Sequence, residues 1–189
     1  MSCVADVSGV GAVRVYLGLG SNLGDRWAHL QEAVHRLGRQ VSIDLLSGLY
    51  ETPPMGPQDQ PWYLNAACAG TTGLDPRGLL AFVKGIEVDM GRTPTVRWGP
   101  RIIDIDLLFY GECVLRSPEL VIPHPGIPDR AFVLAPLMDI APELIHPGLK
   151  EPVSALWQRL SGGRSDLRRV ASALTGRWPY QQSGKDISR

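Results

Sequence analysis

One stretch of the sequence, RWGPRIIDIDLLFYG at residues 97–111, combines a strong strand pattern with two charges. Residues 102–110 are almost continuously apolar, which is typical of a strand buried on both faces. Asp104 and Asp106 lie inside it, and because side chains alternate along a strand, both carboxylates point to the same face. Their Cα atoms are then roughly 6.6 Å apart, so the two charges repel by about 2–3 kcal/mol at an effective dielectric constant of about 20. The fold must offset that repulsion.

Two explanations fit this pair of aspartates. The strand lies at a sheet edge with both side chains in water, or the pair holds a divalent cation. Mg²⁺ takes one or two carboxylates together with waters and substrate phosphates. Arg92, Arg97 and Arg101 lie just upstream, and guanidinium groups bind phosphate oxygens in a bidentate manner. The apolar neighbours and the low strand preference of Asp favour the cation, and the combination indicates phosphoryl-type transfer from a nucleotide.

The composition sets limits on other functions. The chain has 189 residues and is 44% hydrophobic, which suits one domain with a substantial core. Lys+Arg and Asp+Glu are equal at 19 each, so no global basic field exists to bind nucleic acid or an anionic membrane. The sequence also predicts no membrane span and no signal peptide. The three cysteines are scattered, which predicts free thiols and a cytoplasmic location.

Hydrophobic periodicity and turn residues predict a single catalytic domain at residues 12–160, between a loose leader at 1–11 and a polar, frayed tail at 161–189. Strands are expected at residues 13–19, 41–50, 62–71 and 102–110, with a hairpin turn at 111–112 leading into 113–115. Helices are expected from Trp27 to Gly38, from Asp75 to Gly91, from Asp129 to Ile140 and over 155–160. Asp129 is the expected cap of its helix. This order predicts an α+β fold, with a central, largely antiparallel sheet flanked by helices.

The segment GLGSNLG at residues 18–24 has the wrong glycine spacing for a dinucleotide fingerprint and lacks the Lys of a P-loop. Two interpretations stay open: a tight strand-to-helix turn that needs positive φ, or exposed amides at the helix start that face a ligand. Ser21 or Asn22 is the expected cap of the following helix, with Asp25 in its first turn.

The proline-rich loop at residues 51–61 and the strand after it suit a flat, polar heterocycle. Tyr63 and Asn65 face the same way, so one can stack while the other forms hydrogen bonds; alternatively Tyr63 is a core residue and Asn65 caps a bend. His124 either contacts a phosphate or satisfies its own loop. His29, His35 and His146 are expected to be structural or solvated.

Together these stretches resemble the 6-hydroxymethyl-7,8-dihydropterin pyrophosphokinase family of folate biosynthesis. The matching segments, over residues 13–145, are GLGSNLGDR, ETPPMGPQDQPWYLNAA, IEVDMGR, RWGPRIIDIDLLFYG and IPHPGIPDRAFVLAPLMDIAPEL. The resemblance implies a three-layer, ferredoxin-like topology. It also implies transfer of the β,γ-diphosphate of ATP to the hydroxymethyl group of the dihydropterin, by in-line displacement with two Mg²⁺ ions. A functional link to other folate-pathway enzymes is a further expectation.

The resemblance also implies residue roles. Asp104 and Asp106 bind the metal ions and, with Arg92 and Arg101, form the catalytic set. The expected pterin site is Thr52, Pro53, Met55, Tyr63, Asn65 and Phe132. The expected ATP site is Glu87, Arg92, Arg97, Trp98, Arg101, Leu107, His124 and Arg130.

Three positions depart from the family pattern. Only TPTV separates Arg92 from Arg97, where the family loop is often longer and more basic, and Lys84 and Pro125 replace an amide and an aromatic residue of some members. Two other functions remain as alternatives: a nucleotide-sugar transferase that uses the DxD pair, and a pterin- or nucleotide-binding module without turnover.

Overall fold

The structure, a computed structural model, describes residues 11–55, 59–92, 99–160 and 166–171. Over these residues the strands are β1 (Val13–Ser21), β2 (Ser42–Leu46), β3 (Leu49–Thr52), β4 (Tyr63–Thr72), β5 (Asp104–Tyr110), β6 (Leu115–Arg116), β7 (Val121–Ile122) and β8 (Arg168–Ala171). The helices are α1 (Arg26–Leu37), α2 (Pro76–Asp89), α3 (Ala131–Ile140) and α4 (Val153–Arg159).

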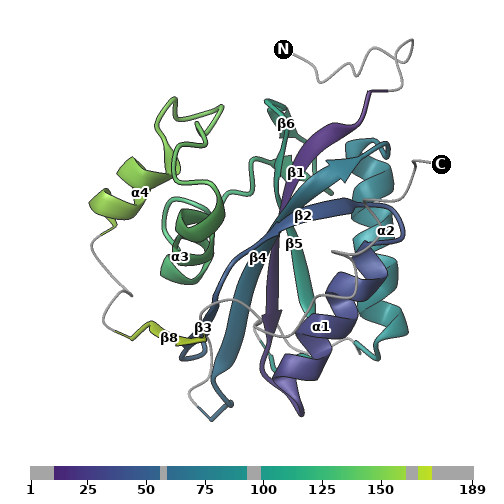
Figure 1. The fold of residues 1–189 in the computed structure, drawn as a ribbon, viewed down its shortest axis with the longest axis vertical. Coiled ribbons are helices and arrows are strands. Elements are labelled where there is room, and N and C mark those ends of the chain that lie inside the picture. The colour runs from purple at the N-terminus through teal and green to yellow at the C-terminus, as the bar shows by residue number, and fades with distance from the viewer. Residues whose placement is uncertain (1–10, 56–58, 93–98, 161–165, 172–189) are drawn as a thin grey trace, which may run out of the picture.

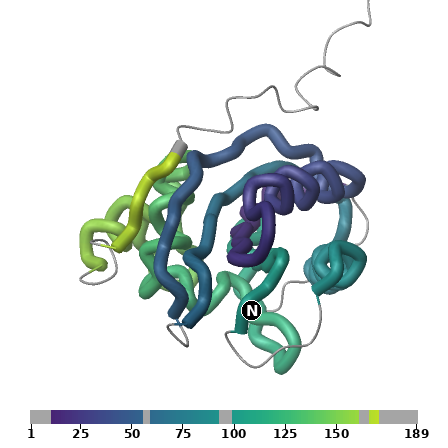
Figure 2. Tube along the Cα trace, turned by 90° about the horizontal axis from the view of Figure 1, so that it is seen from below, coloured from purple at the N-terminus to yellow at the C-terminus, as the bar shows by residue number. Residues whose placement is uncertain are grey.

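The central sheet has the strand order β5-β1-β4-β3-β8, and β2 also pairs with β4. Every pairing in it is antiparallel. Helices α1 and α2 cover one face and α3 and α4 cover the other, so the molecule has three layers (Figures 1 and 2). The predicted α+β fold with helices on both sides of a largely antiparallel sheet is therefore confirmed.

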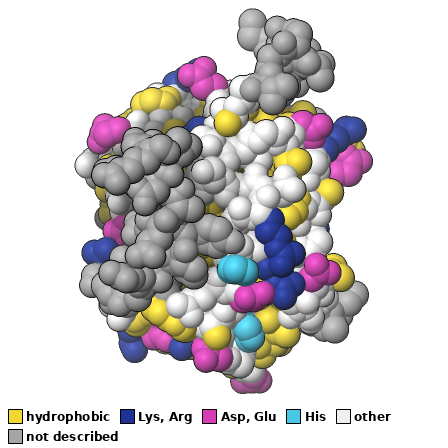
Figure 3. All heavy atoms as spheres, turned by 45° about the vertical axis from the view of Figure 1, so that its right-hand side comes forward, with side chains coloured by type: hydrophobic (Ala, Val, Ile, Leu, Met, Phe, Trp, Pro, Cys, Tyr) yellow, Lys and Arg dark blue, Asp and Glu magenta, His cyan; other side chains and the backbone are white. Residues whose placement is uncertain are grey.

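Two separate apolar cores hold these layers together. Leu17, Leu79 and Ile105 belong to the larger core, which lies between the sheet and helices α1 and α2. Leu134 and Phe109 belong to the smaller core under α3 and α4. The outer face of the α1–α2 layer is polar, and Figure 3 shows acidic, basic and histidine side chains there. This segregation is the amphipathic pattern of helices that cover a sheet.

Side chains cap the starts of α1 and α2 but not those of α3 and α4, and two predicted caps need correction. Asp75 accepts a hydrogen bond from Gly78 N at 2.6 Å and Pro76 occupies the first turn, as expected. For α1 the cap is Asp25, which accepts from Ala28 N at 3.0 Å, rather than Ser21 or Asn22. Helix α3 begins after Arg130 without a side-chain cap, so the prediction of Asp129 is also wrong.

The strand prediction is wrong at two places. Residues 41–50 form two strands, because the chain steps from β2 to β3 at Ser47, whose hydroxyl accepts a hydrogen bond from Ala67 N at 2.8 Å and donates one to Gly48 O at 2.7 Å. The segment after Gly111 does not return along β5 as a hairpin. Instead β6 pairs with β7 in a separate two-stranded sheet.

Two features were not expected from the sequence. Strand β8 lies in the segment that was predicted to be a frayed tail, and it pairs with β3 at the sheet edge. Cys68 is a free, buried thiol as predicted, but Cys113 is disulfide-bonded, so the prediction of free thiols is wrong there. Of the described helices, none has both the length and the apolar character needed to cross a membrane.

Candidate active site

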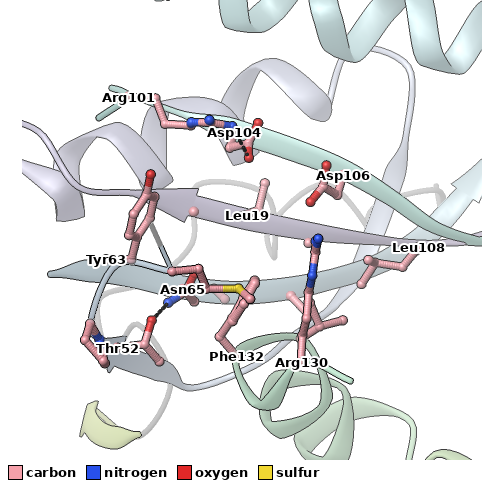
Figure 4. A pocket seen from close by; sticks show the side chains of 17 residues that line it. Leu19, Thr52, Tyr63, Asn65, Arg101, Asp104, Asp106, Leu108, Arg130 and Phe132 are labelled. Atoms are coloured by element: carbon pink, nitrogen blue, oxygen red, sulfur yellow. Dashed lines mark hydrogen bonds and ion pairs between the residues drawn. The ribbon is translucent and has the colours of Figure 1, made fainter. Parts of the chain in front are cut away.

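A pocket opens between the sheet and the start of α3, on the face opposite α1 and α2 (Figure 4). Strands β1, β4 and β5 form its floor, β3 and the residues after it form one side, and α3 forms another. The lining residues are Gly18, Leu19, Gly20, Thr52, Pro53, Met55, Tyr63, Asn65, Ala66, Ala67, Arg101, Asp104, Asp106, Leu108, Arg130, Phe132 and Val133. It thus brings together residues separated by more than 100 positions.

The floor of the pocket is open because β1 carries glycine at two pocket-facing positions. Gly20 lies between Asn65 of β4 and Asp104 of β5, and Gly18 lies between Ala67 and Asp106. A Cβ atom on Gly20 would lie 3.3 Å from Asn65 Oδ1, so a side chain there would fill the space between the two flanking strands. The tight-turn interpretation is wrong for both glycines; the positive φ in this segment is at Gly24, where it is 57°.

Asp104 and Asp106 lie on the same face of β5, as the alternation predicted, but their surroundings differ. Asp104 Oδ1 accepts a hydrogen bond from Arg92 Nη1 at 2.8 Å, and its Oδ2 accepts one from Arg101 Nη1 at 2.8 Å. The Asp106 carboxylate forms no hydrogen bond or ion pair with any of the residues described. Burial, and then the negative charge of Asp104, raise the pKa of Asp106.

Arg101 is held from two directions. Its backbone N donates to Asn22 Oδ1 at 2.7 Å, and Asn22 N donates to Arg101 O at 3.1 Å. Burial acts to lower the pKa of Arg101, but the carboxylate of Asp104 opposes it, so that the pKa is raised. Asn22 therefore positions a candidate catalytic arginine, a role that its local sequence does not indicate because the two residues are 79 positions apart.

Glu87 lies beneath the charged side of the pocket rather than in its lining. Its side chain is only 2% exposed. Oε1 accepts hydrogen bonds from Ile105 N at 2.7 Å and from Lys84 Nζ at 2.8 Å, and Oε2 pairs with Arg92. Glu87 thus joins α2 to β5 and fixes Arg92, which does not line the pocket itself but reaches Asp104.

The opposite side of the pocket is largely neutral. All six residues expected to bind the pterin line it: Thr52, Pro53, Met55, Tyr63, Asn65 and Phe132. Asn65 Nδ2 donates to Thr52 Oγ1 at 2.9 Å and to Tyr50 O at 3.4 Å, so β3 orients this amide. Its Oδ1 then faces the open floor over Gly20 and can accept hydrogen bonds from a ligand. Tyr63 is therefore not simply a core residue, and Asn65 does not simply cap a bend, because both side chains line the pocket.

The remaining residues expected at the ATP site have different positions. Arg130 projects from the start of α3 towards the strand that carries Asp106 (Figure 4). Leu107 is 4% exposed and belongs to the core on the other face of the sheet. Arg97 and Trp98 lie outside the described residues.

His124 lies outside the pocket lining but is linked to β5. Its backbone N donates to Leu108 O at 3.0 Å, next to the β-bulge that interrupts the pairing of β1 with β5. Its Nδ1 accepts from Gly126 N at 3.0 Å, which satisfies the loop. Burial lowers the pKa of His124, and the charge of Asp106 opposes this shift. His124 is also close enough to Asp106 for the charge of that carboxylate to act on it, so it lies near the proposed phosphate side of the pocket.

The donor set suits a metal ion that is completed by a substrate. Within the described residues, no three His, Cys, Asp or Glu side chains form a metal-binding group. The two pocket-facing carboxylates leave most coordination positions to water and phosphate oxygens, which is the arrangement that Mg²⁺ prefers. Asp106 is partly buried and is paired with no cationic side chain among the described residues. A bound metal ion would neutralise its negative charge, which supports this fit.

Comparisons with known proteins agree with this geometry. A family model described as 7,8-dihydro-6-hydroxymethylpterin-pyrophosphokinase matches residues 16–142. A 2-amino-4-hydroxy-6-hydroxymethyldihydropteridine pyrophosphokinase from Methylorubrum extorquens is 49% identical over 137 residues, which are 71% of this chain and 87% of that protein. The protein of the same name from Bacillus subtilis is 40% identical over 157 residues, covering 78% of this chain and 92% of the relative.

Other relatives are much longer. The folic acid synthesis protein of Dictyostelium discoideum is 44% identical over 149 residues, and the match covers 79% of this chain but only 23% of that protein. A crystal structure of Plasmodium falciparum HPPK-DHPS has the same fold, with a TM-score of 0.69 at 18% identity, over 86% of this chain and 47% of that one. With a family model that spans most of its length, this chain belongs to the 7,8-dihydro-6-hydroxymethylpterin-pyrophosphokinase family.

Proposed function

We propose that this protein transfers the β,γ-diphosphate of ATP to the hydroxymethyl group of 6-hydroxymethyl-7,8-dihydropterin. The products are AMP and the pterin diphosphate. The observation that carries the proposal is the division of one pocket into a charged side, with Asp104, Asp106 and Arg101, and a neutral side, with Tyr63 and Asn65. The first side suits a triphosphate and the second a planar heterocycle.

The neutral side would bind the pterin. Tyr63 and Phe132 offer aromatic faces against which the ring can stack. Asn65 Oδ1 faces the open floor and accepts hydrogen bonds from ring N–H or amino groups. The Thr52 hydroxyl and the Tyr50 carbonyl hold the amide in this orientation, so the acceptor is in place before the ligand arrives.

The charged side would bind the nucleotide. Asp104 and Asp106 would hold two Mg²⁺ ions, with phosphate oxygens and water as the other ligands. When bound, such ions neutralise phosphate charge and lower the pKa of a coordinated hydroxyl. Arg92, Arg101 and Arg130 would neutralise charge that develops on the phosphates.

The reaction balances as a single substitution at the β-phosphorus. The hydroxymethyl oxygen forms the new O–P bond and gives its proton to water, and the bond from the β-phosphorus to the α–β bridging oxygen breaks. AMP leaves with that electron pair. The protein's part is to align the two substrates across the glycine floor and to stabilise the charge.

Three further expectations belong to this proposal. The catalytic domain comprises residues 12–160, to which β8 (Arg168–Ala171) adds a strand of the sheet; the protein acts in the cytoplasm, and it has a functional link to other folate enzymes. The link is supported by long relatives that carry this family's domain within larger chains, such as the folate synthesis bifunctional protein of Arabidopsis thaliana, of which the match covers 33%.

A nucleotide-product assay tests the proposal. With ATP, Mg²⁺ and the dihydropterin, AMP should form, and omission of the pterin or chelation of the metal should abolish it. ADP as the product would contradict diphosphate transfer. Binding of UDP-sugars that depends on Mn²⁺ would favour the sugar-transferase alternative. Binding of both substrates without any AMP would favour a binding module.

A further inference from the structure

Strand β8 lies beyond residues 16–142, which the family model matches, and it borders β3, the strand that carries the pocket residue Thr52. It pairs antiparallel with β3, with Leu49 opposite Ala171, Tyr50 opposite Arg169 and Glu51 opposite Arg168. Strand β3 has only four residues. With β4 on one side and β8 on the other, β3 is an interior strand of the sheet instead of an exposed edge (Figures 1 and 2).

Two consecutive arginines of β8 contact aromatic side chains near the edge of the sheet, and because side chains alternate along a strand they lie on opposite faces of it. The Arg168 guanidinium lies 4.5 Å from the centre of the Trp62 ring, and Trp62 immediately precedes the pocket residue Tyr63. The Arg169 guanidinium lies 5.7 Å from the Tyr50 ring, and its Nη2 is 3.2 Å from Asp139 Oδ2. The contacts of Arg168 with Trp62 and of Arg169 with Tyr50 are cation–π interactions, and the contact of Arg169 with Asp139 is an ion pair.

Asp139 belongs to helix α3, which forms one side of the pocket, and its ion pair with Arg169 connects β8 to that helix. Its Oδ2 accepts hydrogen bonds from Tyr50 Oη at 2.9 Å and from Gly48 N at 2.9 Å. Burial and the bond to Asp139 raise the pKa of Tyr50 to about 12, so the tyrosine keeps its proton and its role as donor. Strand β8, strand β3 and helix α3 are therefore tied together at one point.

The same strand β3 sets the direction of the Asn65 amide. Thr52 Oγ1 and Tyr50 O are the two acceptors that hold Asn65 Nδ2. Both belong to β3, which β8 secures from outside. A shift of β3 would release the amide and turn its acceptor away from the pocket floor. The charged side is carried by β5, which β1 and β4 separate from β3.

We propose that β8 is a positioning strand for the pterin side of the pocket, with Arg168 and Arg169 as its positioning residues. It sets the affinity for the heterocycle by fixing β3, and through β3 the Asn65 amide. The charged side should be insensitive to it. This inference rests on the proposed function, because it takes the pterin as the ligand of that side.

The test uses the full chain with Arg168→Ala, Arg169→Ala and the conservative Arg168→Lys. Arg168→Ala removes the contact with Trp62, Arg169→Ala removes the contacts with Tyr50 and Asp139, and both leave the backbone pairing of β8 in place. Arg159→Ala is the matched control, because Arg159 forms an exposed ion pair with Glu151 at 2.7 Å and contacts neither β3 nor the pocket. Calorimetry measures the dissociation constants of the dihydropterin and of a nonhydrolysable ATP analogue with Mg²⁺.

We expect each alanine variant to weaken pterin binding about three- to tenfold, the loss typical of one cation–π contact or hydrogen bond. ATP-analogue binding should stay unchanged, Arg168→Lys should restore most of the pterin affinity, and Arg159→Ala should resemble the wild type. Unchanged pterin binding in both alanine variants, or equal weakening of both ligands, would overturn the inference. If the wild type binds no dihydropterin, the proposed function fails instead.

Discussion

The two sides of the pocket differ in how their polar groups are paired in the absence of ligand. On the pterin side, the Asn65 amide is held by Thr52 and Tyr50, and its free acceptor already faces the floor. On the phosphate side, two arginines are paired with Asp104, while Asp106 forms no ion pair with a described residue. The first side is ready to bind. The second carries competing charge, because Asp104 pairs with the same two arginines that would neutralise the phosphates.

The largest expected effect is on Asp106, the carboxylate that is paired with no arginine of the described residues. Asp106→Asn should lower turnover by about two to three orders of magnitude, because charge stabilisation at the phosphates is lost. Steady-state AMP formation measures this loss, and far-UV circular dichroism should show an intact fold. Turnover within about twofold of the wild type would show that Asp106 takes no part in binding the phosphates or their metal ions.

Asp104→Asn should strengthen phosphate binding, although it also lowers turnover. The substitution removes the negative charge that pairs with Arg92 and Arg101, while Arg92 keeps its ion pair with Glu87. The variant should therefore bind Mg²⁺-free tripolyphosphate about tenfold more tightly than the wild type, even though its turnover falls. Calorimetry in the presence of a chelator measures this affinity. Asp106→Asn is the matched control and should gain less, because no described arginine is paired with it. Equal gains in the two variants would mean that Asp104 does not hold the arginines back.

A smaller effect is expected on the prearranged side. Thr52→Val keeps the volume of the side chain but removes an acceptor from Asn65 Nδ2, which should weaken pterin binding about fivefold. Affinity for the ATP analogue should not change. Fluorescence or calorimetric titration of both ligands measures the difference, and loss of nucleotide affinity of similar size would show that the two sides are not independent.

The smallest effect should come from the Tyr63 hydroxyl. It donates to Gly99 O at 3.3 Å, a long hydrogen bond, and the ring is the part that lines the pocket. Tyr63→Phe should therefore change pterin affinity by less than about threefold, whereas Tyr63→Ala should remove most of it. If the two variants were equally impaired, the hydroxyl rather than stacking would make the important contact.

The sequence predicted those parts of the site that depend on local pattern. Alternation along residues 102–110 placed Asp104 and Asp106 on one face, and the same rule placed Tyr63 with Asn65. The expected strand ended at residue 19, and GLGSNLG was compatible with either a turn or ligand-facing amides, although the alternation of VYLGLGS extends the strand through Gly18 and Gly20. That period-two pattern was the signal that could have identified the pocket floor.

Other features depend on contacts between distant segments and leave no local signal. Asn22 binds the backbone of Arg101, and Glu87 joins Arg92 to β5, so both roles are decided by tertiary packing. Strand β8 was missed because its sequence, RRVA, is short and polar at its start, and its pairing with β3 supplies the stability that its own residues lack. The expected hairpin at Gly111 failed for the same reason, since β7 provides the partner of β6.

The bare backbone at Gly18 and Gly20 also restricts how the protein can escape a compound designed to fill this cavity. Any residue larger than glycine at position 20 would put its first carbon 3.3 Å from Asn65 Oδ1, in the volume where the proposed pterin substrate would bind. On the proposed function, resistance at that position should therefore lower turnover as well. Tolerant changes are confined to the rim, where Met55 is 61% exposed, so inhibitors that contact only the floor and the flanking strands should select for resistance least readily.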